Sequence, residues 1–163
     1  MKIVVSACLM GESCKYNGLD NYHRELVEAC ERTGTEVLLV CPEVFGGLPT
    51  PRKPSEIVNG EVRTCEGTSV DREFRQGAQR ALDMCEQAGG PSQIAACVLQ
   101  DRTPFVWCRP YLRRNLQRYA HRGNGVFVDL LLRHGYRVIP ASEFDPSMLE
   151  HCPQHSNPTL PHG

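Results

Sequence analysis

A chain of 163 residues, of which 40% are hydrophobic, is long enough for one domain with a buried core. Its formal net charge of −1 gives no global field that would attract nucleic acid or a membrane surface. No apolar run approaches the roughly 20 residues that a membrane-spanning helix requires. The N-terminal segment also lacks the apolar region of a signal peptide, so the sequence predicts a cytoplasmic protein with no membrane partner.

In chain order, the patterns predict strands at 2–7, 36–40, 94–99 and 136–140 and a β-hairpin with strands 56–58 and 61–63. Helices are predicted at 20–32, from Ser69 or Asp71 to 87, and at 126–134. This alternation of strands and helices predicts a single-domain α/β fold. We expect an open, mostly parallel, Rossmann-like sheet with flanking helices, plus the small β-hairpin. The domain should span residues 1–144, followed by a poorly ordered tail at 145–163. The oligomeric state does not follow from the sequence.

The nine cysteines are unusually many for a chain of this kind. An odd number of cysteines, without an export signal, argues against a disulfide framework and favours metal binding or thiol chemistry. Cysteines inside predicted helices and strands are explained as part of the core. Four others are the candidates for chemistry: Cys8, Cys14, Cys41 and Cys108.

Two of these cysteines, Cys8 and Cys41, directly follow predicted strands. The strand–helix–strand unit that contains them should be a parallel crossover, so both strands end at one edge of the sheet. Neighbouring strands lie about 4.8 Å apart, and ligands of open α/β sheets bind at this edge. We therefore expect the two thiols to lie close enough to share a metal cluster. The proline-rich loop 42–52, predicted to be neither helix nor central strand, carries Glu43 beside them, and Arg52 is interpreted as a brace for that loop.

Four segments resemble a known family in their order and spacing: 6–11 (SACLMG), 14–18 (CKYNG), 41–44 (CPEV) and 46–52 (GGLPTPR). They resemble the small bacterial family that includes the thiouracil desulfidases, the TudS-like proteins. The resemblance implies an oxygen-sensitive [4Fe-4S] cluster held by three cysteines, whose fourth iron is free to bind the sulfur of a thiolated pyrimidine. The implied reaction converts 2-thiouracil to uracil and sulfide.

The resemblance also implies roles for particular residues. Cys8 and Cys41 are then cluster ligands, and Cys14 is either a ligand or a nearby functional thiol. Glu43 is the carboxylate expected to move the protons that this hydrolysis requires. Thr103 matches the first serine of a family block and keeps its hydroxyl, so it is a second candidate catalytic residue.

The third cysteine ligand of the family lies in a Ser-Pro-Ser-Cys-Gly block, and here this block departs from the pattern. Val106 occupies the position of the cysteine, and Cys108, two residues later, is an alternative candidate for the third ligand. The stretch 109–122 matches nothing in the family, and the family pattern resumes at Gly123. The chain as it stands lacks the third ligand of that block, which implies impaired desulfuration.

A frameshift would explain this segment. Codons can be chosen for residues 105–122 so that the same bases, read in a shifted frame, encode Ser-Cys-Gly-Val-Gly-Arg-Ile-Tyr-Asp-Gly-Thr-Phe-Ser-Gly-Thr-Leu-Ile-Ala. That peptide is the family's own block. We interpret the segment as translated out of frame between two compensating indels, and resequencing the DNA of this region tests the interpretation.

Two non-catalytic interpretations compete with the enzyme. The arginines and aromatic residues in 107–122 have the chemistry of a nucleic-acid-binding module, which the acidic remainder of the chain opposes. Alternatively, Cys8, Cys14 and Cys41 hold zinc. Absorption at about 400 nm after anaerobic reconstitution would distinguish an iron–sulfur cluster from zinc. A redox thiol protein has less support, because the chain contains no C-x-x-C motif.

Overall fold

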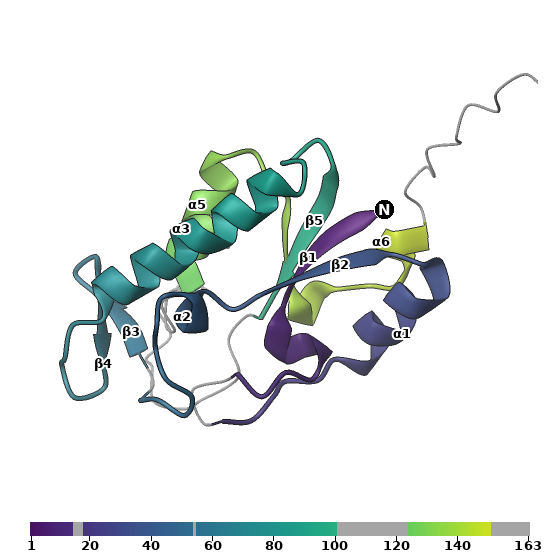
Figure 1. Cartoon of the computed structure of the whole chain (residues 1–163). Helices are drawn as coiled ribbons and strands as arrows, with labels where there is room; N and C mark the ends of the chain where they lie inside the picture. The colour runs from purple at the N-terminus through teal and green to yellow at the C-terminus, as the bar shows by residue number, and fades with distance from the viewer. Residues whose placement is uncertain (15–17, 54, 101–123, 151–163) are drawn as a thin grey trace, which may run out of the picture.

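The computed structural model describes residues 1–14, 18–53, 55–100 and 124–150. Its centre is a parallel sheet with the strand order β2-β1-β5-β6 (Figure 1). The strands are β1 (Lys2–Ser6), β2 (Glu36–Val40), β5 (Ile94–Leu99) and β6 (Val138–Pro140). Because all of them run in the same direction, their carboxyl ends form one edge of the sheet. The predicted α/β fold with a mostly parallel sheet is therefore confirmed.

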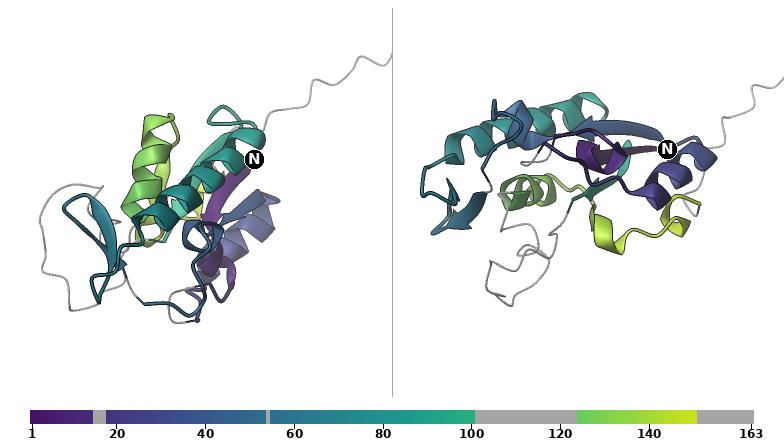
Figure 2. Two further views of the ribbon diagram at one scale, coloured as in Figure 1. Left: turned by 60° about the vertical axis from the view of Figure 1, so that its left-hand side comes forward. Right: turned by 90° about the horizontal axis from the view of Figure 1, so that it is seen from below.

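One face of the sheet is covered by α3 (Asp71–Gln87) and α5 (Asn124–Arg133), which lie beside each other in Figure 2. Val4 of β1 faces this layer and is fully buried. Ile3 and Val5, its neighbours in the strand, face the opposite layer and are equally buried. Alternating side chains of a strand point to opposite faces, so a continuous apolar run is what a strand between two helical layers requires.

The opposite face is covered by α1 (Arg24–Thr33), the 3-10 turn η2 (Ala141–Glu143) and α6 (Ser147–Glu150). Leu149 of α6 is buried in this layer, although it lies beyond the expected domain boundary at residue 144. The boundary itself stays a prediction, and residues 151–163 of the expected tail lie outside the described residues. Within the described ranges, no helix combines the length and apolarity needed to cross a membrane.

The predicted β-hairpin is present as β3 (Ser55–Val58) and β4 (Glu61–Thr64), which pair antiparallel. Asn59 and Gly60 join them, with φ angles of 50° and 80°. Both angles are positive, as a two-residue hairpin turn with Asn-Gly requires. The hairpin is anchored by Val62, which packs against Phe74 of α3.

The start of α1 differs from the prediction, which placed it at Asp20. The helix begins at Arg24, and His23 caps it by accepting a hydrogen bond from the backbone N–H of Leu26 at 3.2 Å. The carboxylate of Asp20 instead accepts from the N–H of Tyr22 at 3.0 Å and forms a local turn. Aspartate favours helix starts and such turns for the same reason, so the residue type alone did not separate them.

The loop after β2 also differs from the prediction, because it begins with a helical turn. Residues Pro42–Phe45 form α2, with Cys41 at its N-cap position. Proline was interpreted as excluding a helix here. Proline is in fact well suited to the first helical position, because its fixed φ matches the helix. An N–H at this position would have no acceptor within the helix, so its absence costs no hydrogen bond.

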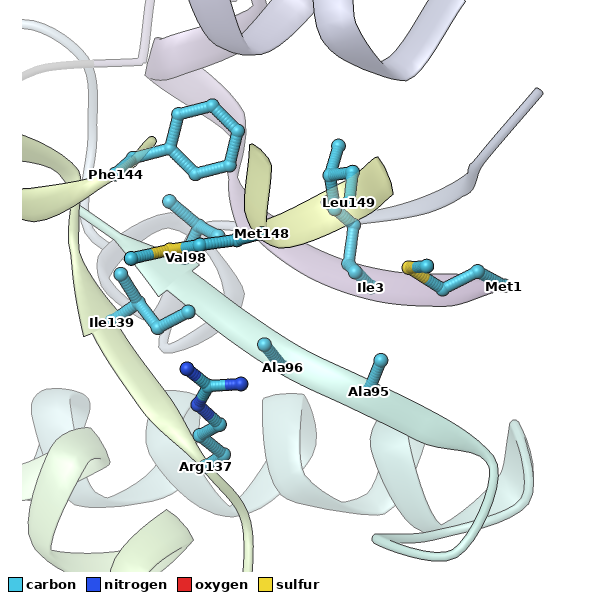
Figure 3. Close-up of a pocket in the computed structure, with 10 residues that line it drawn as sticks. All are labelled: Met1, Ile3, Ala95, Ala96, Val98, Arg137, Ile139, Phe144, Met148 and Leu149. Carbon is cyan, nitrogen blue, oxygen red and sulfur yellow. The ribbon is translucent and has the colours of Figure 1, made fainter. Parts of the chain in front are cut away.

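A pocket lies on the α6 side of the sheet (Figure 3). Its lining is mainly apolar, with Ile3, Val98, Ile139 and Phe144, and Arg137 is its charged member. Among the described residues, no cysteine or carboxylate lines it. The candidate chemistry therefore has to be sought elsewhere, at the carboxyl edge of the sheet.

Candidate metal centre at the sheet edge

Cys8 and Cys41 lie at the carboxyl edge of neighbouring strands. Cys41 directly follows β2, and Cys8 lies in the 3-10 turn η1 (Ala7–Met10), which follows β1. The last residues of the two strands, Ser6 and Val40, are partners in the sheet register. Figure 1 shows η1 and α2 at the same end of the sheet. The two predicted positions therefore meet at one edge, although Cys8 lies one residue further from its strand than expected.

Cys14 joins these two residues from the loop after η1. Its thiol lies close enough to those of Cys41 and Cys8 for both to shift its pKa. The thiol of Cys41 also lies 4.0 Å from the carbonyl oxygen of Cys14. Three thiols from two separate stretches of the chain thus gather at this edge, which we call the thiol cluster.

Two thiols of the cluster, those of Cys14 and Cys41, have raised pKa values and hold their protons tightly. The hydrogen bond with Cys41 lowers the pKa of Cys14, but the hydrogen bond with Cys8, burial and the charge of Cys8 raise it, to about 11 in sum. The hydrogen bond with Cys14 and burial raise the pKa of Cys41 still further. A metal that binds thiolates must therefore displace protons from these groups, as is general for cysteine sites.

Arg52 connects the loop of Cys14 with the loop of Glu43. Its Nη2 donates to the carbonyl oxygen of Cys14 at 2.8 Å, and its guanidinium forms an ion pair with Glu43. Its Nη1 donates to the oxygens of Pro49 and Thr50 at 3.2 and 3.1 Å. The side chains of Arg52 and Glu43 are only 8% and 15% exposed. The interpretation of Arg52 as a loop brace agrees with these contacts, and the arginine in addition orients the carboxylate.

Glu43 is also placed by the packing of α2 on α3. Gly46 and Gly77 bring the two backbones into direct contact: a Cβ at Gly77 would overlap the carbonyl of Pro42, and one at Gly46 would overlap the carbonyl of Glu73. Both contacts are with backbone atoms, which cannot rotate away. The close approach of these helices therefore depends on two positions without side chains.

Gly77→Ala is expected to push α2 away from α3 and to displace Glu43. Overpacking of this kind costs about 1–3 kcal/mol, and the change should lower both the melting temperature and the desulfuration rate. Thermal unfolding and a kinetic assay measure the two effects. Gln76→Ala is a control for a substitution in the same helix, because Gln76 is the exposed neighbour of Gly77 in α3. Equal effects of both changes would contradict a specific helix contact.

Asn21 is a neighbour of the thiol cluster that the sequence did not reveal. Its Nδ2 lies 3.8 Å from the sulfur of Cys8, and its backbone N–H donates to the carbonyl of Cys8 at 3.0 Å. Two further predicted residues, Thr103 and Cys108, lie outside the described residues together with Val106. Their roles stay predictions.

The donor set of the thiol cluster has the chemistry that an iron–sulfur cluster requires. In the part of the chain that the structure describes, no three His, Cys, Asp or Glu side chains are arranged to hold one metal ion. An iron–sulfur cluster makes a different demand, because each thiolate binds its own iron, and soft sulfur ligands are the ones such clusters use.

Fold and site together define a small α/β protein with cysteines gathered at the carboxyl edge of a parallel sheet. A family model described as 2-thiouracil desulfurase matches residues 3–143, and the chain belongs to this family. The fold is similar to that of a solved [4Fe-4S]-dependent thiouracil desulfidase, TudS. That match has 33% sequence identity and a TM-score of 0.66, and it covers 90% of this chain and 94% of the other.

A curated relative is an uncharacterized protein, YbbK, of Bacillus subtilis (strain 168). It is 28% identical over 153 residues, which is 88% of this chain and 97% of the relative. The similarity therefore extends over nearly the whole of both compared proteins. It agrees with the family assignment suggested by the motifs.

Proposed function

We propose that this chain is an enzyme that removes sulfur from thiolated pyrimidines, converting 2-thiouracil to uracil and sulfide, with a [4Fe-4S] cluster bound at the thiol cluster. The observation that carries the proposal is the meeting of the Cys8, Cys14 and Cys41 thiols near the partly buried Arg52–Glu43 pair. Membership of the 2-thiouracil desulfurase family names the reaction. The name of the solved relative names the cofactor.

Cys8 and Cys41 are proposed as two of the cluster ligands. Cys14 is proposed as the third thiolate in the present chain, because Val106 stands where the family has its ligand and the thiol of Cys14 already contacts the other two. When bound, the cluster supplies an open iron that acts as a soft Lewis acid toward a thiocarbonyl sulfur. With Cys14 in place of the family's third cysteine, impaired desulfuration is expected.

Glu43 is proposed to move the protons of the reaction. Hydrolysis adds the oxygen of one water to the ring carbon and releases the sulfur as hydrogen sulfide, so a proton has to leave the water and another group has to receive it. The carboxylate of Glu43 can accept that proton and return it to the departing sulfur. Nε of Arg52 donates a hydrogen bond to Oε2 of Glu43 and so holds the carboxylate in one orientation. Thr103 is kept as a second candidate for a polar contact with the substrate.

The reaction is thus classed as a hydrolysis, within a domain proposed to span residues 1–144. The described residues include seven cysteines, and none of them forms a disulfide. Cysteines in this number without disulfides are typical of a reducing compartment, and we place the activity in the cytoplasm.

The proposal is tested by anaerobic reconstitution with iron and sulfide, followed by incubation with 2-thiouracil. The present chain is compared with a version in which the in-frame block replaces residues 105–122. We expect about four irons per chain in the restored version and fewer in the present one. Uracil formation is measured in both.

Cys14→Ser, made in both versions, tests the third ligand. It should remove most of the remaining iron from the present chain and leave the restored version loaded, because there the block supplies the ligand. Iron and sulfide counted per chain, with the absorption spectrum, give the result. A restored version that binds no cluster and leaves 2-thiouracil unchanged would contradict the proposed function. Equal iron loss in both versions would show that Cys14 does not substitute for the missing cysteine.

A further inference from the structure

The amide of Asn21 lies against the sulfur of Cys8. Nδ2 of Asn21 is 3.8 Å from this sulfur, within the range of a hydrogen bond to sulfur. Cys8 itself is only 7% exposed, so water has little access to the sulfur from outside. The amide is therefore a donor built into the protein beside a proposed cluster ligand.

The backbone around Asn21 is held in register with η1. The N–H of Asn21 donates to the carbonyl of Cys8 at 3.0 Å, and the N–H of His23 donates to the carbonyl of Leu9 at 2.8 Å. Between them, the N–H of Tyr22 donates to the side chain of Asp20 at 3.0 Å. Main-chain hydrogen bonds therefore hold this segment against η1. They fix the position of the Asn21 side chain independently of its hydrogen bond to the sulfur of Cys8.

The direction of the amide follows from its chemistry. A thiolate has no proton and can only accept hydrogen bonds, so the nitrogen of the amide is the atom that stabilises it. Hydrogen bonds to ligand sulfurs are among the factors that set the reduction potential of iron–sulfur clusters. By drawing charge from the thiolate, such a bond favours the reduced cluster and makes the iron more electron-poor.

We propose that Asn21 is a positioning residue that donates an N–H···S hydrogen bond to the Cys8 thiolate and thereby raises the reduction potential of the bound cluster and slows its loss. The proposal rests on the proposed function only in requiring a cluster at Cys8. It does not depend on the role of Glu43 or on the identity of the third ligand. Its effect is therefore measurable without any desulfuration assay.

The test compares Asn21→Leu, which keeps the shape of the side chain and removes both N–H donors, with Asn21→Gln, which keeps the amide. Asp20→Ala is the matched control, because it breaks the neighbouring side-chain bond in the same segment and leaves the amide intact. The midpoint potential is measured by a redox titration followed by electron paramagnetic resonance. The rate of iron release to a chelator is measured separately, and both versions of residues 105–122 are used.

Asn21→Leu is expected to move the midpoint potential to a more negative value. It should also speed iron release by about 10–100-fold, the range typical of residues that support metal ligands. Asn21→Gln should fall between it and the unchanged protein, and Asp20→Ala should change neither quantity. An unchanged potential in Asn21→Leu, or equal shifts in Asn21→Leu and Asp20→Ala, would overturn the inference while leaving the proposed function intact. Absence of any cluster from the unchanged protein in both versions would overturn the proposed function and this inference together.

Discussion

Glu43→Gln is expected to lower kcat for desulfuration of 2-thiouracil by about 10²–10⁴-fold, the usual contribution of a positioned general base. The amide keeps the size of the side chain but cannot accept the proton of water. Iron content should not change, because Glu43 is not a proposed ligand. The rate under anaerobic conditions and the iron count per chain are measured on the same preparation.

The ion pair with Arg52 requires its own control in this experiment. Removing one partner of a buried pair leaves the other charge uncompensated and destabilises the fold, so the melting temperature has to be followed as well. Glu28→Gln is a matched control, since it removes the carboxylate of an exposed ion pair with Arg24 within α1. Near-normal turnover by a folded, cluster-loaded Glu43→Gln protein would contradict the role given to this carboxylate.

The fold followed from the sequence where local pattern and tertiary structure agree. The apolar runs 2–7 and 36–40, separated by one helical segment, are sufficient to predict neighbouring parallel strands whose ends coincide. The Asn59-Gly60 pair predicts its turn equally well, since few other dipeptides accept two positive φ angles. In both cases the residues that carry the signal are close together in the chain.

The errors arose where one residue type serves two local structures. Pro42 ends helices in general but starts α2, and Asp20 could have capped a helix but forms a turn instead. In each case, residues distant in sequence decide which of the two local structures forms. The contact of Gly77 with Pro42 keeps α2 in place, and the contact of His23 with Ala141 accompanies the start of α1.

The sequence predicted which residues of the chain belong to the site, but not the contacts between their side chains. Cys8 and Cys41 follow from topology, and Glu43 follows from its spacing to Cys41. The hydrogen bonds that join Arg52 to Cys14 and Asn21 to Cys8 link residues that are 38 and 13 positions apart in the sequence. No periodic pattern in the sequence indicates such side-chain contacts, so they required the structure.

Cys41→Ser is expected to abolish cluster binding. A serine hydroxyl has nearly the shape of the thiol but does not ionise at neutral pH, so it is a poor ligand for iron. The loss should exceed the roughly 10–100-fold effect of residues that only support a ligand. Iron and sulfide counts after reconstitution measure it directly, and uracil formation should fall with them.

The fold should survive this change, because the thiol of Cys41 is only partly buried and the replacement is close in volume. The free energy of unfolding of metal-free Cys41→Ser protein should therefore lie within about 1 kcal/mol of that of the unchanged metal-free chain. Cys65→Ser, at an exposed thiol outside the thiol cluster, should leave iron binding unaffected. If Cys41→Ser and Cys65→Ser bound iron equally well, the carboxyl edge of the sheet would not be the metal centre. If only Cys41→Ser lost its iron, while metal-free Cys41→Ser and Cys65→Ser proteins were equally stable, the loss would not come from a damaged core. The sulfur of Cys41 would then be a ligand of the metal.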